Sequence, residues 1–200
     1  MSLPSSVSST LGRTIVLTGG PGAGKTAVLE VARRDLAPSV QILPESASIV
    51  FGGGFPRRHD EDGRRAAQRA IYHVQSELER MSIDRDSAQV TLCDRGTIDG
   101  LAYWPGLWED FFADLGTTLE RELARYAAVV HLRVPDGTNG YRPSALRIES
   151  VQEAHAIDQR LLDVWGRHPR RIIIETDADF LRKTQRTLDV LRGLLRNVPG

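Results

Sequence analysis

The chain is poor in cysteine, and its charges cancel. The single cysteine, Cys93, excludes an intramolecular disulfide and suits a reducing compartment. The 26 basic residues balance the 26 acidic ones, so no overall field draws the chain to nucleic acid or to an anionic membrane. No apolar run approaches the roughly 18 residues of a membrane span, and the first residues lack the basic and apolar regions of a signal peptide. These absences predict a cytoplasmic protein.

The remaining composition is sufficient for one globular domain. The chain has 200 residues, of which 40% are hydrophobic and 26% charged, and a typical domain has roughly 100 to 200 residues. The serine-rich residues 1–11 are predicted to form a disordered tail, which leaves 12–200 as a single domain. The five histidines show no ligand spacing, so a structural zinc site is not expected.

Apolar runs alternate with longer segments of helical period, which is typical of a parallel sheet covered by helices. Strands are predicted at five runs, residues 14–18, 40–43, 89–93, 128–134 and 171–174. Helices are predicted at 25–36, from 64 to about 81, within 97–124, from 150 onward, and at 179–196. Three consecutive glycines and a proline make 51–63 a predicted surface loop.

A glycine cluster, "GGPGAGKT", follows the first predicted strand and opens the first helix. It fits the pattern G-x-x-x-x-G-K-[ST] of a P-loop, in which backbone N–H groups and a helix N-terminus surround phosphate oxygens. The lysine reaches the β- and γ-phosphates, and the threonine hydroxyl is a ligand for Mg²⁺. We therefore expect residues 12–200 to bind ATP or another nucleoside triphosphate. The predicted contacts are Gly19, Gly20, Pro21, Gly22, Ala23, Gly24, Lys25, Thr26 and Ala27.

Lysine is scarce, which sharpens this prediction. The chain has 24 arginines and only two lysines, Lys25 and Lys183. A compact ammonium on a flexible stem fits a phosphate cradle, whereas a planar guanidinium would crowd it. The placement of a rare residue type at the one position where its chemistry is needed favours a functional motif over an accidental match.

A carboxylate for the metal is expected at Asp94, which ends the apolar run "VTLCD". At the carboxyl end of a strand beside the loop, it would hold Mg²⁺ directly or through water, as Thr26 would from the helix. The alternative is an aspartate that only terminates the strand. Cys93, one residue earlier, is predicted to face the core as a small apolar residue.

Four segments together resemble a known family. They are "TIVLTGGPGAGKTAVLE", "LPESAS", "DRGTIDGLAYW" and "GYRPSALRIES". The chain resembles, from about Thr14 to Leu195, the P-loop ATPase and kinase-like domains related to the ribosylnicotinamide kinase half of bacterial NadR-type proteins. This resemblance implies an α/β, three-layer P-loop NTPase fold of the kinase type. It also implies a five-stranded parallel sheet of order 2-3-1-4-5 with helices on both faces.

The resemblance also suggests residues on the acceptor side. Related nucleoside and nucleotide kinases often place an acidic residue just past the second strand, beside the acceptor hydroxyl, and Glu45 stands there. A glutamate favoured by the dipole of a helix N-terminus is the alternative. Arg95 is expected to face the transferring phosphate or the acceptor, or else to pair with a neighbouring carboxylate. Asp99 and Tyr103, one helical turn apart, are further candidates for substrate contact.

Arginines after the fourth strand are candidates for a lid. In kinases of this fold such a segment closes over the phosphates and brings arginines to the transition-state charge. Arg142 is the first candidate and Arg147 the second, with a solvated loop as the alternative. Arg57 and Arg58 would hold an anionic acceptor if their segment is a substrate flap, and are otherwise a solvated charge run.

The sequence thus favours a kinase that transfers the γ-phosphoryl group of ATP to the hydroxyl of a small, nucleoside-like or other metabolite. The predicted catalytic residues are Lys25, Glu45, Asp94, Arg95, Arg142 and Arg147. The alternative function is a regulatory NTPase that hydrolyses nucleotide without an acceptor. A nucleic-acid kinase gains no support from the neutral charge, and neither a membrane nor a nucleic acid is expected as a partner.

Overall fold

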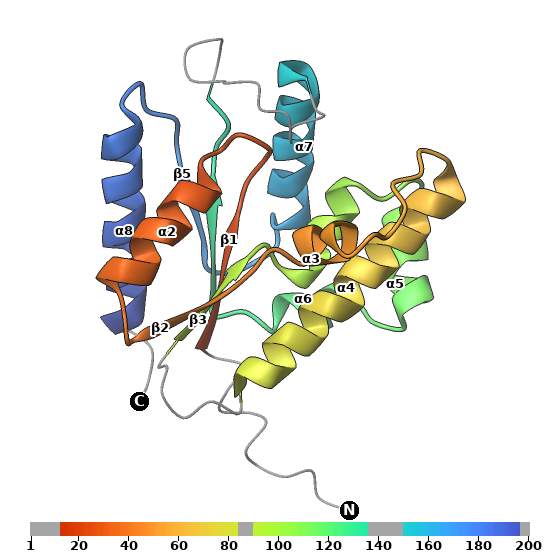
Figure 1. Cartoon of the computed structure of the whole chain (residues 1–200), viewed down its shortest axis with the longest axis horizontal. Helices are drawn as coiled ribbons and strands as arrows, with labels where there is room; N and C mark the ends of the chain where they lie inside the picture. Colours follow the sequence, from red (N-terminus) through yellow and green to blue (C-terminus); the bar gives the residue numbers. More distant parts are fainter. Residues whose placement is uncertain (1–12, 84–89, 136–149, 197–200) are drawn as a thin grey trace, which may run out of the picture.

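Five short strands form one parallel sheet through the centre of the molecule (Figure 1). The computed structural model describes residues 13–83, 90–135 and 150–196. The strand order is β2-β3-β1-β4-β5, which confirms the predicted order and the five predicted strands. The strands are β1 (Thr14–Thr18), β2 (Val40–Leu43), β3 (Val90–Asp94), β4 (Ala128–Leu132) and β5 (Arg171–Ile174).

Helices cover both faces of this sheet and give three layers (Figure 1). On one face lie α2 (Lys25–Asp35) and α8 (Phe180–Arg196). The other face carries α3 (Ser46–Gly52), α4 (Glu61–Ile83), η2 (Thr97–Ala102), α5 (Trp108–Leu115), α6 (Leu119–Leu123) and α7 (Val151–Val164).

The central strand β1 separates two apolar clusters, because alternate side chains of a strand point to opposite faces. Ile15 and Leu17 pack with α2 and α8, whereas Val16 packs on the other side with η2, α5 and Trp165. Each of these buried aliphatic side chains contributes about 1.5–3 kcal/mol. Burial on both faces explains why the strands are continuous apolar runs rather than alternating ones.

The connection between α3 and α4 is shorter than the predicted loop at 51–63. Helix α3 continues to Gly52, and α4 already begins at Glu61. Asp60 accounts for the early start of α4, because its Oδ1 accepts a hydrogen bond from the Gly63 N–H at 2.9 Å. An aspartate in this position satisfies one of the free N–H groups of a first helical turn.

Helix α7 begins as predicted. The hydroxyl of Ser150 accepts from the Glu153 N–H, and the Glu153 carboxylate accepts from the Ser150 N–H, which completes a capping box. The predicted tail at 1–11 lies outside the described residues. In the part of the chain that is described, no helix combines the length and the apolar composition needed to cross a bilayer.

Candidate functional site

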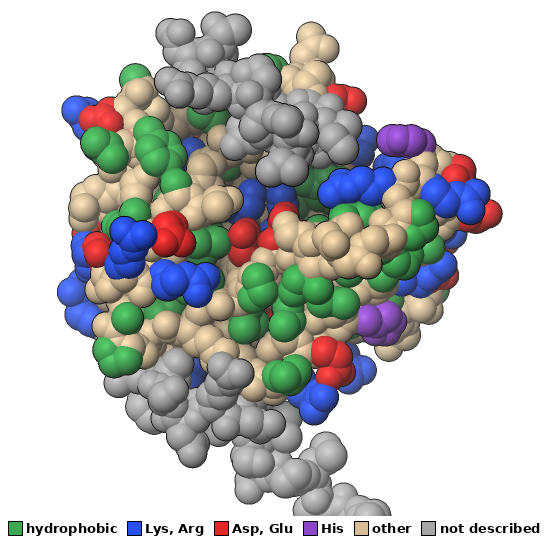
Figure 2. Space-filling view, in the orientation of Figure 1, with side chains coloured by type: hydrophobic (Ala, Val, Ile, Leu, Met, Phe, Trp, Pro, Cys, Tyr) green, Lys and Arg blue, Asp and Glu red, His purple; other side chains and the backbone are tan. Residues whose placement is uncertain are grey.

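The glycine-rich loop and the Asp94 carboxylate meet at one edge of the sheet. The loop leaves the carboxyl end of β1, and Asp94 is the last residue of the neighbouring strand β3, in register with Leu17. Because both strands are parallel, both connections emerge on the same side. Acidic and basic side chains meet near the centre of the face shown in Figure 2.

Two glycines of the loop have conformations that favour glycine. Gly19 has a φ of +139°, and a Cβ there would lie 2.2 Å from the Leu132 carbonyl oxygen. Gly24 has a φ of +95°, and its Cβ would lie 2.7 Å from Cε2 of Phe180. The positive φ favours glycine at both positions, and at Gly19 the contact with a backbone carbonyl also excludes a side chain. The backbone of the loop is therefore packed tightly against β4 and the start of α8.

The N-terminus of α2 is open to an anion. Its N-cap residue is Gly24, no side chain caps it, and its first turn contains no acidic residue. The free N–H groups and the positive end of the helix dipole therefore point at the loop without a protein carboxylate to neutralise them. This arrangement fits a phosphate group.

Lys25 is buried beneath the loop. Its Nζ donates to the carbonyl oxygens of Gly19 at 2.8 Å and Gly20 at 3.3 Å. Burial and, to a smaller extent, the charge of Arg95 lower the pKa of Lys25 to about 8, although nearby carboxylates such as Asp94 oppose the shift. Two neutral carbonyls are weak partners for an ammonium, so a phosphate oxygen would be a stronger one.

Asp94 fits the role of a magnesium ligand. Its Oδ1 is buried and has no hydrogen-bond partner in the described residues. Burial raises the pKa of Asp94, while the charges of Lys25 and Arg95 lower it. An unsatisfied buried carboxylate oxygen calls for a partner such as a cation. Thr26 offers its hydroxyl from the first turn of α2.

The described residues contain no cluster of three His, Cys, Asp or Glu side chains that could hold a metal. Mg²⁺ bound through one carboxylate, phosphate oxygens and water needs no such cluster. The donor set at Asp94 and Thr26 is therefore compatible with magnesium that arrives with a nucleotide, rather than with a resident metal.

Arg95 lies at the centre of the site in a strained conformation. Its φ of +74° is the only positive value at a non-glycine residue among those described, and such a conformation costs about 1–3 kcal/mol. Nε donates to Glu45 Oε1 at 2.7 Å, and Nη1 lies 3.4 Å from Asp99 Oδ1 and 3.5 Å from the Gly19 oxygen. The guanidinium carbon lies 5.8 Å from the centre of the Tyr103 ring. Arg95 thus links the loop to the start of α3.

Glu45 lies at a helix N-terminus, beside Arg95. It is the N-cap residue of α3, and its Oε2 accepts from the Ser48 hydroxyl at 2.6 Å. Burial alone would raise the pKa of Glu45, but the charge of Arg95 and the Ser48 hydrogen bond outweigh it, so the pKa lies below its ordinary value. The carboxylate is therefore ionised at neutral pH and held beside the arginine.

Asp99 serves the fold rather than a ligand. It is buried, and its Oδ1 accepts from the Thr18 hydroxyl at 2.5 Å. Its Oδ2 accepts from the Gly96 N–H at 2.9 Å and from Trp165 Nε1 at 3.2 Å. Because protein donors occupy both oxygens, the structure does not favour the suggested contact of this side chain with a substrate.

Two further residues contact the loop and were not found from the sequence. The second lysine, Lys183, is only 3% exposed, and its Nζ donates to the Ala23 carbonyl at 2.9 Å and to the Arg133 carbonyl at 2.5 Å. Both lysines of the chain therefore hold carbonyl groups of the same loop. The scarcity of lysine was the signal that could have revealed this role.

Asp158 of α7 is the second residue that contacts the loop and was not found from the sequence. Its Oδ1 accepts from the Gly20 N–H at 3.0 Å and lies 2.8 Å from His131 Nε2, while its Oδ2 lies 3.4 Å from the Val134 nitrogen. Only the tertiary fold reveals this contact, because in the sequence Asp158 is one polar residue within an amphipathic helix.

Of the remaining predicted arginines, the structure describes only Arg57 and Arg58. Arg142 and Arg147 lie outside the described residues. Arg57 stacks on the Phe51 ring, with its guanidinium carbon 3.9 Å from the ring centre, and Arg58 pairs with Asp60 at 2.8 Å. Both arginines of the suggested flap thus have partners within their own segment.

The fold of this chain is similar to that of solved kinase structures. The deoxyadenosine kinase from M. mycoides with bound dATP is 14% identical, covers 90% of this chain and 99% of its own, and has a TM-score of 0.58. The same enzyme with the products dCMP and a flexible dCDP is 12% identical, with the same coverage and a TM-score of 0.55. Shikimate kinase from Aquifex aeolicus is 15% identical, covers 92% of this chain and 99% of its own, and has a TM-score of 0.48. At 12–14% identity the likeness to deoxyadenosine kinase shows the fold alone.

The search of curated proteins gives no match to this chain. A family model described as "AAA domain" matches residues 14–183, from the first residue of β1 to the buried lysine of α8. This match includes the glycine-rich loop and Asp94 and spans most of the sequence. The chain therefore belongs to the AAA domain family of P-loop proteins.

Proposed function

We propose that this protein is a magnesium-dependent kinase that transfers the γ-phosphoryl group of ATP to the hydroxyl of a small molecule. The observation that carries the proposal is one arrangement of charges at the sheet edge. It combines the Lys25 ammonium under the loop, the unpartnered oxygen of Asp94, and the Arg95–Glu45 pair beside them. The fold of the kinases above supports it.

In this proposal the loop and Lys25 bind the phosphates, and Thr26 and Asp94 would hold Mg²⁺, which neutralises phosphate charge. An acceptor oxygen forms the new bond to the γ-phosphorus as the bond from that phosphorus to the β-phosphate oxygen breaks. Glu45 orients the acceptor hydroxyl and receives its proton, and Arg95 faces the charge on the transferred group.

The second candidate is a regulatory NTPase, which the Arg95–Glu45 contact also fits. At 2.7 Å the two groups satisfy each other, so in this alternative the pair is structural and water replaces the acceptor. Both candidates use the same loop and the same metal ligands, and only the acceptor side separates them.

An assay of ADP release separates the two. The protein is supplied with Mg²⁺ and ATP, with and without panels of nucleosides, other hydroxyl-bearing metabolites and 5′-hydroxyl oligonucleotides. Stimulation by a metabolite, with label transferred from γ-labelled ATP, supports the kinase. Equal slow turnover under every condition contradicts it. Lys25→Ala abolishes nucleotide turnover in either case, whereas Arg34→Ala, at an exposed position of the same helix, leaves it unchanged.

We also propose that the protein works in the cytoplasm. Cys93 is buried and free, and burial raises the pKa of its thiol well above the ordinary value. A buried neutral thiol is compatible with a reducing compartment.

A further inference from the structure

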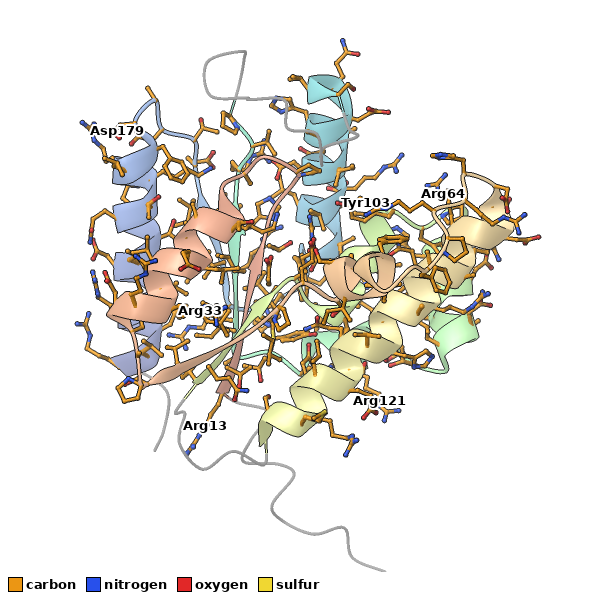
Figure 3. The ribbon with its side chains drawn as sticks, viewed as in Figure 1. Arg13, Arg33, Arg64, Tyr103, Arg121 and Asp179 are labelled. Carbon is orange, nitrogen blue, oxygen red and sulfur yellow. The ribbon has the colours of Figure 1, made fainter. Side chains whose placement is uncertain are left out.

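Three arginines contact the two consecutive residues Ala102 and Tyr103. Arg95 lies over the ring, and Arg64 donates from Nη2 to the Tyr103 carbonyl at 2.9 Å. Arg160 donates from Nη1 to the preceding carbonyl, that of Ala102, at 3.3 Å. The three arginines come from the end of β3, from the first turns of α4 and from α7. Figure 3 labels Arg64 and Tyr103 close together, beside α7 and the start of α4.

Of these three arginines, Arg95 pairs with the Glu45 carboxylate, and the other two differ from it. Among the described residues, Arg64 and Arg160 form no ion pair with a carboxylate, and both are exposed. The next residue along α4, Arg65, pairs with Glu61 at 2.9 Å and with Asp110 at 3.3 Å. Neighbouring arginines on the same helix thus differ: Arg65 has two acidic partners, whereas Arg64 has only a carbonyl.

Helix capping explains only part of this arrangement. The two carbonyls belong to the last residue and the C-cap residue of η2, and a cation at a helix C-terminus is favourable. A guanidinium has five N–H donors in a planar fork, and one carbonyl occupies few of them. The donors that remain can bind a carboxylate or a phosphate in the bidentate manner that suits arginine.

The group is adjacent to the proposed acceptor side. Arg95 contacts both the Tyr103 ring and Glu45, with 2.7 Å between its Nε and the Glu45 carboxylate. We propose that the acceptor carries an anionic group, a carboxylate or a phosphate, which Arg64 and Arg160 bind while its hydroxyl lies beside Glu45. This inference rests on the kinase function proposed above. It defines the acceptor class as hydroxy acids or phosphorylated alcohols.

The first test measures anion binding without an acceptor reaction. The nucleotide site is saturated with Mg²⁺ and a non-hydrolysable ATP analogue, and inorganic phosphate and acetate are titrated in separate experiments. The wild type is compared with the double variant Arg64→Gln, Arg160→Gln. We expect the double variant to bind at least one of the two anions about 10-fold more weakly or worse. Equal affinity of both proteins for both anions overturns the inference.

Arg121→Gln is the matched control, because Arg121 is exposed and lies near the other end of α4 in Figure 3. It should bind both anions as the wild type does. The exposed positions of Arg64 and Arg160 favour a folded variant, and thermal unfolding checks this. If phosphate binding is lost and acetate binding is not, the anionic group is a phosphate, and the opposite result assigns a carboxylate.

The second test uses matched acceptors, each alcohol being offered with and without its anionic group. A preference for the anionic member that disappears in the double variant supports the inference. Equal transfer to both members by both proteins refutes it and leaves the kinase proposal intact. If no alcohol accepts phosphate but the double variant still loses anion binding, the kinase proposal fails and the anion site stands.

Discussion

Replacing Lys183 with methionine tests whether the buried ammonium sets the shape of the glycine-rich loop. The peptide that joins Ala23 to Gly24 is held through its carbonyl, on the side of α8. The carbonyl and the N–H of a trans peptide point in opposite directions, so the Gly24 N–H is directed away from α8. We expect that N–H to bind phosphate, and Lys183 to keep it in place.

The structure allows the effect on stability to be estimated. Methionine removes two charge-assisted hydrogen bonds, to the Ala23 and Arg133 carbonyls, each worth about 1.5–3 kcal/mol. Methionine also removes a charge whose burial is unfavourable, as the lowering of the Lys183 pKa from 10.5 to about 8 indicates. Removing this charge should therefore stabilise the variant by roughly 3 kcal/mol, which opposes the loss of the two hydrogen bonds. The net loss of unfolding free energy should therefore lie between roughly zero and 3 kcal/mol.

Nucleotide binding should suffer more clearly than stability. We expect Lys183→Met to raise the Kd for a fluorescent ATP analogue about 10-fold, which is about 1.4 kcal/mol. The measurement is a titration well below the melting temperature of the variant. Arg182→Met, at the exposed neighbouring position, should leave the Kd unchanged. A lower melting temperature with an unchanged Kd would refute this reasoning, because Lys183 would then serve stability alone.

The remaining predictions concern the charges at the sheet edge. The variant Asp94→Asn should still bind ATP when magnesium is absent, but its turnover with magnesium should fall by about 100-fold or more. Turnover measured over a magnesium titration checks this. Glu45→Gln should retain ATP binding and lose about 10² to 10⁴ of phosphoryl transfer in the labelled-ATP assay, and intact transfer excludes it as the base. The pKa values of Lys25 and Lys183 are both about 8, and in their proposed roles both lysines act in the protonated form. ATP affinity should therefore fall from pH 8 to 10, and constant affinity over that range contradicts both roles.

The glycine-rich loop after β1 and the position of Asp94 at the end of β3 could be predicted because their signals are local. The loop is eight consecutive residues, and the aspartate ends a recognisable apolar strand. The contacts of the loop could not be predicted in the same way. Lys183 is 160 residues from Ala23, and Asp158 is 138 residues from Gly20. No local pattern specifies such pairs, since they form only when α7 and α8 pack against the sheet.

The sequence also left two readings of Glu45 and Arg95 open, and the geometry explains why. Arg95 could pair with a carboxylate or face a ligand, and it lies 50 residues from Glu45 in the chain. The structure places both groups at the same sheet edge because β2 and β3 are neighbours and parallel. The positive φ of Arg95 has no sequence signal, since few residues other than glycine adopt it.

The loop is held by opposite charges from two helices. Asp158 of α7 accepts from the Gly20 N–H, and Lys183 of α8 donates to the Ala23 carbonyl. Because one anchor fixes an N–H and the other a carbonyl, the peptides between them lose freedom before any phosphate arrives. When a loop is already ordered, a smaller part of the binding free energy is lost in ordering it. Loss of either anchor should therefore weaken phosphate binding even where it leaves the fold intact.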